Sequence, residues 1–316
     1  LALSACAAVT YPAGPAALAP RLDPDRLVMT VGARLPLRVW RQPGPPQAVV
    51  LALHGMNDYS NFFAEPGTYL AGRGIASYAY DQRGFGQGPH PRHWSSTETM
   101  ADAARAAIAL LAARQPGVPV VLFGESMGGA VAMLAATEPP AGLDGIVLAA
   151  PAVWGRAAMP WWQRTLLWLA YQVSPGWTPS GRGLGISPSD NIEMLRKLGA
   201  DPLVIKETRI DAIKGVVDLM DAAQQAPAAI RPPTLFLYGA HDEIIPAAPS
   251  WAAAAAIPDR RAAYYPDGWH MLVRDLKARV VLDDIAAWVL DAAAPLPSGA
   301  EALTPPLSEK VCSCSS

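Results

Sequence analysis

The chain has 316 residues, of which 51% are apolar, with a charged fraction of 16% and a formal net charge of −2. This composition supplies no basic stripe for nucleic acid, and no apolar run approaches the roughly 20 residues that a membrane-spanning helix needs. The apolar fraction suffices for a sizeable core, and large α/β folds reach this length as one unit.

Apolar strands and alanine-rich or amphipathic helices alternate along most of the chain. We expect an opening hairpin at 27–31 and 35–41, followed by strands at 49–53, 75–80, 118–123, 146–150, 234–238 and 261–265. Helices are expected near 61–71, 99–114, 126–137, 249–256 and 278–290. The alternation predicts an α/β fold with a mostly parallel sheet of eight strands, flanked by helices on both faces.

The first 26 residues are expected to precede this core as a signal-peptide remnant and a tether. Leu3-Ser-Ala-Cys6 matches the cleavage site of bacterial lipoprotein signal peptides, in which the cysteine becomes the lipidated first residue. The Ala-, Pro- and Gly-rich stretch that follows is typical of a flexible linker. We therefore expect a membrane-anchored lipoprotein of the bacterial cell envelope, facing the periplasm or the cell surface. An ordinary small apolar cysteine at Cys6 is the alternative.

The most specific chemical signal is Gly124-Glu125-Ser126-Met127-Gly128, between an expected strand and a helix of small residues. A strand, a glycine-flanked serine and a helix in this order indicate a nucleophile elbow. A serine hydroxyl needs a base to take its proton and an acid to orient that base. The pattern therefore predicts a serine hydrolase with Ser126 as the nucleophile.

The acid and the base are expected downstream of the serine, in that order. His270 lies in a loop before the final helix and is the candidate base. Asp242 directly follows an apolar strand and is the candidate acid, with Glu243 and Asp267 as its rivals. The neighbouring His241 is expected to be a bystander.

Two backbone amides should stabilise the oxyanion that forms in the transition state. Met127, the residue after the nucleophile, supplies one amide. Met56 supplies the other, because it follows an apolar strand that ends in His54-Gly55. We expect His54 to shape this loop rather than to transfer protons, and we also consider it a candidate contact for the substrate.

Several motifs together carry a family resemblance: His54-Gly55, Asp81-Gln-Arg-Gly-Phe-Gly86, Gly124-Glu-Ser-Met-Gly-Gly129, Gly239-Ala-His-Asp242 and Gly268-Trp-His270. They resemble the α/β-hydrolase superfamily, and within it the monoacylglycerol lipase and lysophospholipase group. The resemblance implies the α/β-hydrolase fold, a triad of Ser126, Asp242 and His270, and an oxyanion hole formed by the amides of Met56 and Met127.

The same resemblance implies a carboxylic-ester hydrolase that acts on a single-acyl lipid, a monoacylglycerol or a lysophospholipid, through an acyl-serine intermediate. A general short-chain esterase or thioesterase is one alternative, and a non-catalytic envelope protein on the same fold is another. Asn57, Asp58, Tyr59 and Glu125 lie beside the motifs and could contact a head group or belong to the scaffold.

The alternation of strands and helices breaks between residues 152 and 231, where α/β hydrolases insert a cap. Four of the ten tryptophans lie between Trp161 and Trp177. Trp161, Trp162 and Trp168 are therefore candidate contacts for an acyl chain or a membrane surface, and packing of cap against core is the alternative. The predicted boundaries are a core at 27–151 and 232–293, a helical cap at 152–231 and a flexible tail at 294–316.

Cys312 and Cys314 lie in the predicted tail. Two thiols cannot form a structural zinc site by themselves, and no third ligand is near them in the sequence. We expect no metal, no disulfide framework and no cofactor.

Overall fold

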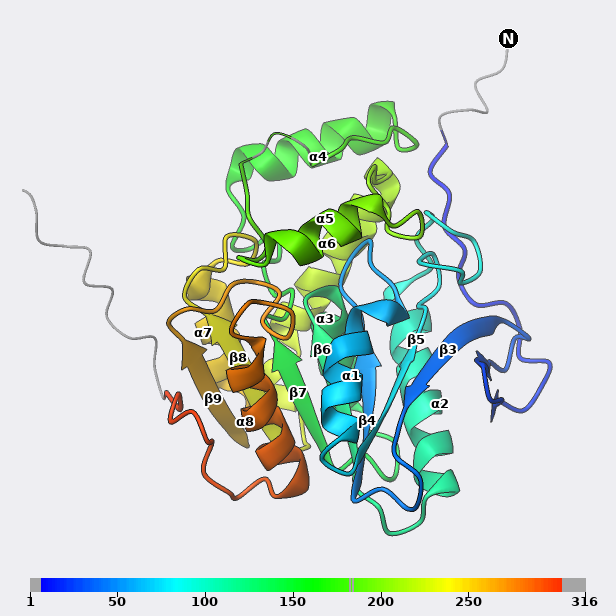
Figure 1. Ribbon diagram of the computed structural model, residues 1–316. Coiled ribbons are helices and arrows are strands. Elements are labelled where there is room, and N and C mark those ends of the chain that lie inside the picture. Colours follow the sequence, from blue (N-terminus) through cyan, green and yellow to red (C-terminus); the bar gives the residue numbers. More distant parts are fainter. Residues whose placement is uncertain (1–6, 182, 184, 303–316) are drawn as a thin grey trace, which may run out of the picture.

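The computed structural model describes residues 7–181, 183 and 185–302 (Figure 1). Cys6, on which the lipidation prediction rests, lies outside these residues, as do Cys312 and Cys314. None of the helices in the described ranges has the length and hydropathy that crossing a bilayer requires.

The described residues form a single sheet of nine strands in the order β1-β2-β3-β5-β4-β6-β7-β8-β9. The strands are β1 Arg21–Leu22, β2 Arg26–Val28, β3 Arg34–Trp40, β4 Ala48–Leu53, β5 Ile75–Tyr80, β6 Val120–Glu125, β7 Gly145–Ala149, β8 Thr234–Gly239 and β9 Arg260–Tyr265. β1, β2 and β3 pair antiparallel, β3 pairs antiparallel with β5, and all pairs from β5 to β9 are parallel. The prediction of a mostly parallel sheet is confirmed, but the strand number is corrected from eight to nine by the two-residue β1.

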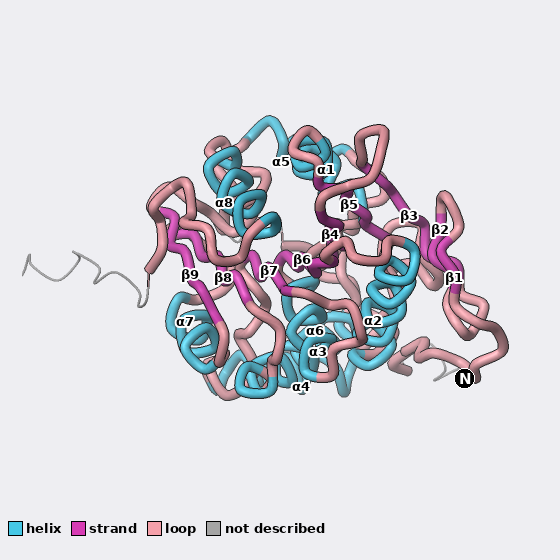
Figure 2. Tube along the Cα trace, turned by 90° about the horizontal axis from the view of Figure 1, so that it is seen from below, coloured by secondary structure: helices cyan, strands magenta, loops and turns pink. Residues whose placement is uncertain are grey.

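Helices cover both faces of the sheet, as the view along the strands shows (Figure 2). The α-helices of the described residues are α1 Ala64–Ala71, α2 Thr97–Arg114, α3 Met127–Thr137, α4 Trp161–Val173, α5 Ile192–Ala200, α6 Ile210–Gln225, α7 Ala247–Ala256 and α8 Ala278–Leu290. Side chains alternate between the two faces along a strand. In β4, Val49 and Leu51 belong to the core that includes α2 and α3, whereas Val50 and Ala52 belong to the core that includes α1 and α8. Burial on both faces explains why these strands are continuous apolar runs in the sequence.

The described part of the N-terminal segment contacts the folded unit, and the prediction of a tether reaching residue 26 is corrected. The Tyr11 amide donates a hydrogen bond to the Trp94 carbonyl at 2.9 Å, and the Val9 amide donates to Asp211 Oδ2 at 3.1 Å. The Tyr11 ring stacks on the ring of His90 at 3.9 Å between centroids. Backbone pairing of this kind depends little on residue type, so composition alone could not reveal it.

The predicted C-terminal tail also begins too early at residue 294. The Tyr264 amide donates to the Ala300 carbonyl at 2.9 Å, and the Ala302 amide donates to the Ala262 carbonyl at 2.8 Å. Leu296 is buried in the core beside α8. Residues 294–302 therefore belong to the folded unit and cover the free edge of β9.

In the described part of the segment between β7 and β8 there are three α-helices, α4, α5 and α6, and a short 3-10 helix at Pro227–Ala229. Figure 1 shows α4 and α5 beyond the carboxyl ends of the parallel strands, while α6 runs beside α3. α6 buries an apolar stripe that includes Val217, Leu219 and Met220, whereas neither α4 nor α5 contains a buried residue. This is the part of the chain for which the sequence predicted a cap.

Candidate active site

Ser126 lies between the end of β6 and the first residue of α3, with φ 54° and ψ −116°. A positive φ is strained for a residue other than glycine. The turn is held because the Ser126 amide donates to the Ala149 carbonyl at 3.0 Å and the Ala152 amide donates to the Ser126 carbonyl at 2.9 Å. A side chain at Gly124 would collide with the backbone of Gly128, so the glycine before the serine is a steric requirement of the turn.

His270 and Asp242 form a buried hydrogen-bonded pair. His270 Nδ1 donates to Asp242 Oδ2 at 2.9 Å, and the side chains of His270 and Asp242 are 5% and 0% exposed. Asp242 Oδ1 accepts the amides of Ile244 at 2.8 Å and Ile245 at 2.9 Å. A proton held on Nδ1 leaves the Nε2 lone pair of His270 free to act as a base.

The rival carboxylates are engaged elsewhere. Glu243 Oε2 accepts the Ser187 amide at 2.7 Å, and Asp267 pairs with Lys277 at 2.6 Å on the surface. His241 is exposed, and its ring stacks on that of Trp269 with 5.1 Å between centroids. The structure thus brings Asp242, and neither rival, to His270.

The parallel sheet places the serine, the acid and the base at one edge. Ser126 follows β6, Asp242 follows β8 and His270 follows β9, and β6 to β9 are consecutive neighbours in the sheet. The loops after β8 and β9 are joined by the His241 amide, which donates to the Gly268 carbonyl at 2.9 Å. Carboxyl ends of parallel strands are the usual position of α/β active sites.

The two predicted oxyanion donors belong to segments that adjoin the serine. Met127 is the first residue of α3, and an amide at that position has no partner within its helix. The loop that carries Met56 passes close to the nucleophile, because a Cβ atom added to Gly55 would lie 3.4 Å from Ser126 Cβ. Oxyanion holes in hydrolases are commonly built from such backbone amides, and the roles of Met56 and Met127 stay a prediction.

The family described as Hydrolase_4, serine aminopeptidase S33, matches residues 44–277. The chain belongs to this hydrolase family. It is 25% identical over 263 residues to the monoacylglycerol lipase of Mycolicibacterium smegmatis, which covers 82% of this chain and 94% of the relative. It is 27% identical over 283 residues to the human monoglyceride lipase, covering 85% of this chain and 91% of the relative.

The structure of this hydrolase is similar to that of a soluble variant of the monoglyceride lipase from Saccharomyces cerevisiae in complex with a substrate analogue. The TM-score is 0.71 at 20% identity, with 90% of this chain and 99% of that chain covered. At this identity the likeness shows the shared fold. The family and the two relatives make the chain a monoacylglycerol lipase-like α/β-hydrolase.

His54 is part of the scaffold of the hydrolase and is completely buried. Its Nδ1 lies 2.8 Å from the Gly55 carbonyl, and its Nε2 accepts the Gln82 amide at 3.0 Å. Burial lowers the pKa of His54, which favours the neutral ring that both contacts require. Its nomination as a substrate contact is corrected, because no surface of the ring is available to a ligand.

Arg274 is a site residue that the sequence analysis missed. Its Nη1 donates to Asp58 Oδ2 at 2.7 Å and its Nη2 donates to Glu125 Oε1 at 2.5 Å, with all three side chains buried. Burial alone would lower the pKa of Arg274, but the two carboxylates outweigh it and raise the pKa. One guanidinium thereby joins the oxyanion loop, the elbow and the His270 loop. The sequence held two hints of this ion pair: Arg274 lies four residues after His270, and Glu125 is an acidic residue within the elbow motif.

The other head-group candidates also have partners within the chain. Asn57 Nδ2 donates to Thr208 Oγ1 at 2.7 Å, and the Tyr59 hydroxyl donates to Asp201 Oδ2 at 2.7 Å. Both contacts join the oxyanion loop to the segment between β7 and β8. With the Arg274 pairs to Asp58 and Glu125, all four candidates fit the scaffold alternative.

Trp161, Trp162 and Trp168 lie on α4 and remain 71%, 53% and 60% exposed. The structure therefore places them on the outer surface of the segment between β7 and β8, and packing against the core does not account for them. They contribute to the exposed surface of α4.

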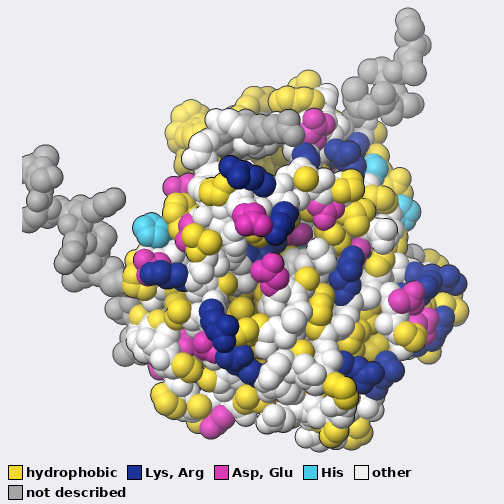
Figure 3. All heavy atoms as spheres, viewed as in Figure 1, with side chains coloured by type: hydrophobic (Ala, Val, Ile, Leu, Met, Phe, Trp, Pro, Cys, Tyr) yellow, Lys and Arg dark blue, Asp and Glu magenta, His cyan; other side chains and the backbone are white. Residues whose placement is uncertain are grey.

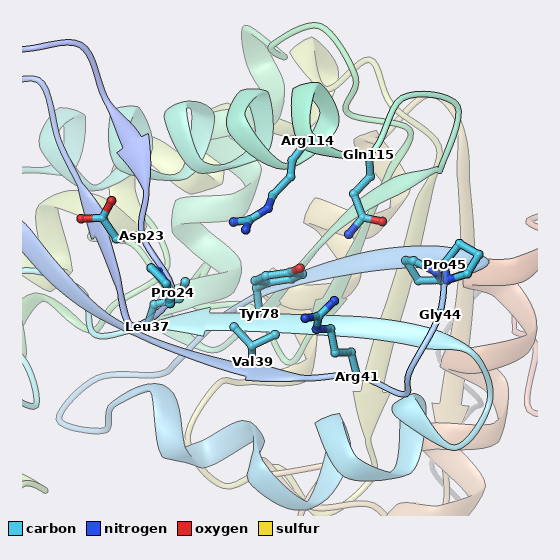
Figure 4. A pocket seen from close by; sticks show the side chains of 11 residues that line it. Asp23, Pro24, Leu37, Val39, Arg41, Gly44, Pro45, Tyr78, Arg114 and Gln115 are labelled. Carbon is cyan, nitrogen blue, oxygen red and sulfur yellow. The ribbon is translucent and has the colours of Figure 1, made fainter.

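A groove of about 520 Å³ lies away from the candidate catalytic residues, between β3, β5 and the end of α2. Figure 4 shows Arg114 approaching it from α2 and Arg41 from the end of β3, with the Tyr78 ring between them. None of Ser126, Asp242 and His270 lines this groove. Within the described ranges, no three His, Cys, Asp or Glu side chains group so as to hold a metal ion.

Proposed function

We propose that the protein is a serine carboxylic-ester hydrolase that cleaves single-acyl lipids, monoacylglycerols or lysophospholipids. The observation that carries the proposal is the buried His270–Asp242 pair at the sheet edge where the strained Ser126 lies. The likeness to two monoacylglycerol lipases over more than four fifths of the chain favours a glycerol ester over other acyl compounds.

The reaction follows from the roles of these groups. His270 Nε2 takes the proton of Ser126 as its Oγ attacks the ester carbonyl carbon, and the amides of Met56 and Met127 stabilise the oxyanion. The tetrahedral adduct collapses, the C–O bond to the alcohol breaks, and His270 returns the proton to the leaving oxygen. Water then gives a proton to His270 and attacks the carbonyl carbon of the acyl-serine. The bond from that carbon to Ser126 Oγ breaks, His270 returns the proton to Oγ and the fatty acid leaves, while Asp242 holds the imidazole in position.

The exposed face of α4 supports contact with lipid. Trp162, Leu166, Leu169 and Val173 recur at helical spacing, are between 47% and 71% exposed, and form one stripe. Figure 3 shows hydrophobic side chains along the top of the molecule, where α4 runs. Such a stripe on a helix that buries no residue fits an interfacial helix better than a helix that packs on a core. In this proposal residues 152–231 act as a cap, and α4 rests on the lipid aggregate.

The cellular location is part of the same proposal and rests on the sequence. Lipidation of Cys6 would attach the enzyme to a bacterial envelope membrane, facing the periplasm or cell surface. A membrane-bound enzyme would meet its single-acyl substrates where they partition. Mass spectrometry of the N-terminal peptide from the native organism tests this, and an unmodified cysteine contradicts it.

Hydrolysis of monoacylglycerols and lysophospholipids of increasing acyl length, with Ser126→Ala as the blank, tests the proposal. Rates that peak at medium or long chains and vanish in the blank support a single-acyl lipid hydrolase. A peak at the shortest esters favours a general esterase, with thioesters assayed in parallel. No serine-dependent rate and no labelling of Ser126 by a fluorophosphonate would instead indicate a non-catalytic protein.

A further inference from the structure

The segment 187–191, here called the strap, connects the helices between β7 and β8 to both catalytic loops. The Ser187 amide donates to Glu243, the residue after the acid, at 2.7 Å. The Met271 amide, directly after the base, donates to the Pro188 carbonyl at 3.0 Å. Asn191 Nδ2 donates to the Arg274 carbonyl at 2.9 Å. The strap therefore spans the loops that carry Asp242 and His270.

Asp275 is the centre of this junction and is buried. Its Oδ1 accepts the Ser189 hydroxyl at 2.6 Å, and its Oδ2 accepts the amide of Trp269, the residue before the base, at 2.7 Å. Ser189 is itself completely buried, and its Oγ accepts the Asn191 amide at 3.1 Å. Both carboxylate oxygens are thus used, one on the strap and one on the His270 loop.

The strap leads directly into α5. Asn191 is the N-terminal cap of that helix and accepts the Met194 amide on Oδ1 at 3.1 Å. Since α5 buries no residue of its own, the strap is a principal attachment of its first turn to the folded unit. A displacement of α5 would be transmitted through Asn191 and Ser189 to Asp275.

The surroundings of Asp275 make an ionised carboxylate costly. Burial raises the pKa of Asp275 to about 6, the Asp190 and Glu125 carboxylates add to the rise, and the hydrogen bonds from Ser189 and Trp269 oppose it. Two donors aimed at two oxygens match the ionised form, whereas an amide would present N–H groups to one of those donors. A costly buried group at this place is more consistent with a positioning role than with stability alone.

We propose that Asp275 is a positioning residue that holds the His270 loop against the strap and so keeps the imidazole aligned while α5 is seated over the sheet. The inference rests on the proposed hydrolase function. It goes beyond the triad because it makes alignment of the base depend on the segment between β7 and β8.

Steady-state kinetics on a short soluble ester test the role. We expect Asp275→Asn to lower kcat at least about tenfold with KM changed less than about twofold, because misalignment affects the chemical step more than binding. Asp275→Glu should recover part of kcat. The matched control is Asp267→Asn, the same change on an exposed carboxylate of the same loop, which should stay within about twofold of wild type.

Ser189→Ala removes the hydrogen bond from the Ser189 hydroxyl to Asp275. It tests the positioning role of Asp275 even if Asp275→Asn fails to fold. It should lower kcat in the same direction while the far-UV spectrum and cooperative unfolding stay native. Unchanged kcat and unchanged fluorophosphonate labelling rate in a folded Ser189→Ala or Asp275→Asn enzyme would overturn the positioning role. Wild-type protein that shows no labelling at Ser126 would overturn the hydrolase proposal itself, so the two failures are distinguishable.

Discussion

Arg274 donates from Nη2 to Glu125 Oε1 at 2.5 Å, and this contact ties the residue before the nucleophile to the loop that carries the base. The other terminal nitrogen of Arg274, Nη1, donates to Asp58, which lies two residues beyond Met56. A planar guanidinium can hold two carboxylates in fixed directions, which the ammonium of a lysine cannot. One buried cation therefore sets the relative positions of the three loops of the site.

Removing the cation should be severely destabilising. Arg274→Met leaves the buried carboxylates of Glu125 and Asp58 without their cation, so we expect the free energy of unfolding to fall by about 3–5 kcal/mol. Urea unfolding monitored by tryptophan fluorescence measures the change. The control is Arg21→Met, which breaks an exposed pair with Asp23 and should cost less than about 1 kcal/mol. A loss at Arg274 as small as that of the control would mean that the cation is not needed.

Asp242→Asn should abolish most activity without unfolding the protein. The amide no longer selects the imidazole form with its proton on Nδ1, so kcat should fall by about 10⁴-fold with little change in KM. The kinetics are measured on a soluble ester, with Asp267→Asn as the control of the same chemical change. Substantial activity in Asp242→Asn would mean that another carboxylate orients His270.

Local sequence patterns were sufficient to predict the strands of the sheet and the nucleophile elbow. Strands buried on both faces are apolar runs, so β4 at Ala48–Leu53 was expected at 49–53. The elbow imposes its steric limits on adjacent residues, and this is why Gly124 and Gly128 flank Ser126 in the sequence itself. Both features can be recognised in the sequence because each structural requirement is met by residues that are adjacent in the chain.

The connections between loops could not be predicted in the same way. Arg274 meets Glu125 across 149 residues and Asp58 across 216 residues, and no local pattern encodes such a pairing. The packing of Tyr11 on His90 and the burial of Leu296 were missed for the same reason. Pro- and Ala-rich composition at both ends favoured flexible segments, whereas tertiary contacts hold their described parts against the folded unit.

The raised pKa of Asp275 predicts a specific pH dependence of stability. The folded protein holds the Asp275 proton up to about pH 6, whereas the unfolded chain releases it near the ordinary value of 3.8. Between these values the folded state binds more protons, so this contribution stabilises the protein at low pH and is lost as the pH rises through 6. The free energy of unfolding of wild type relative to Asp275→Asn should decrease by up to about 3 kcal/mol across that window.

Denaturant unfolding of both proteins at several values between about pH 4 and pH 7 measures that difference. Other carboxylates titrate in the same range, so the comparison with the variant isolates the contribution of Asp275. The Asp267→Asn protein should follow the wild-type curve, because its carboxylate is exposed. A wild-type curve parallel to that of Asp275→Asn would show that burial does not shift this group.

The stripe on α4 predicts that lipid binding and chemistry can be separated. Leu166 and Val173 are 61% and 71% exposed, so changing both to Ser removes apolar surface without opening the core. The variant should hydrolyse a short soluble ester at the wild-type rate. On vesicles that contain a monoacylglycerol it should bind more weakly, by about 1–3 kcal/mol for the lost apolar area.

Vesicle co-sedimentation and hydrolysis on the same vesicles provide the two readouts. Lys197→Ser with Glu193→Ser is the matched control, since it changes two exposed residues of the adjacent helix α5 that form an ion pair rather than an apolar stripe. Because the exposed pair contributes little to stability, the control should fold and bind as wild type does. If the α4 variant binds vesicles normally, the stripe does not meet lipid and another partner must cover it. If it binds weakly and also loses activity on the soluble ester, α4 supports the active site itself, and its apolar face is not solely a membrane contact.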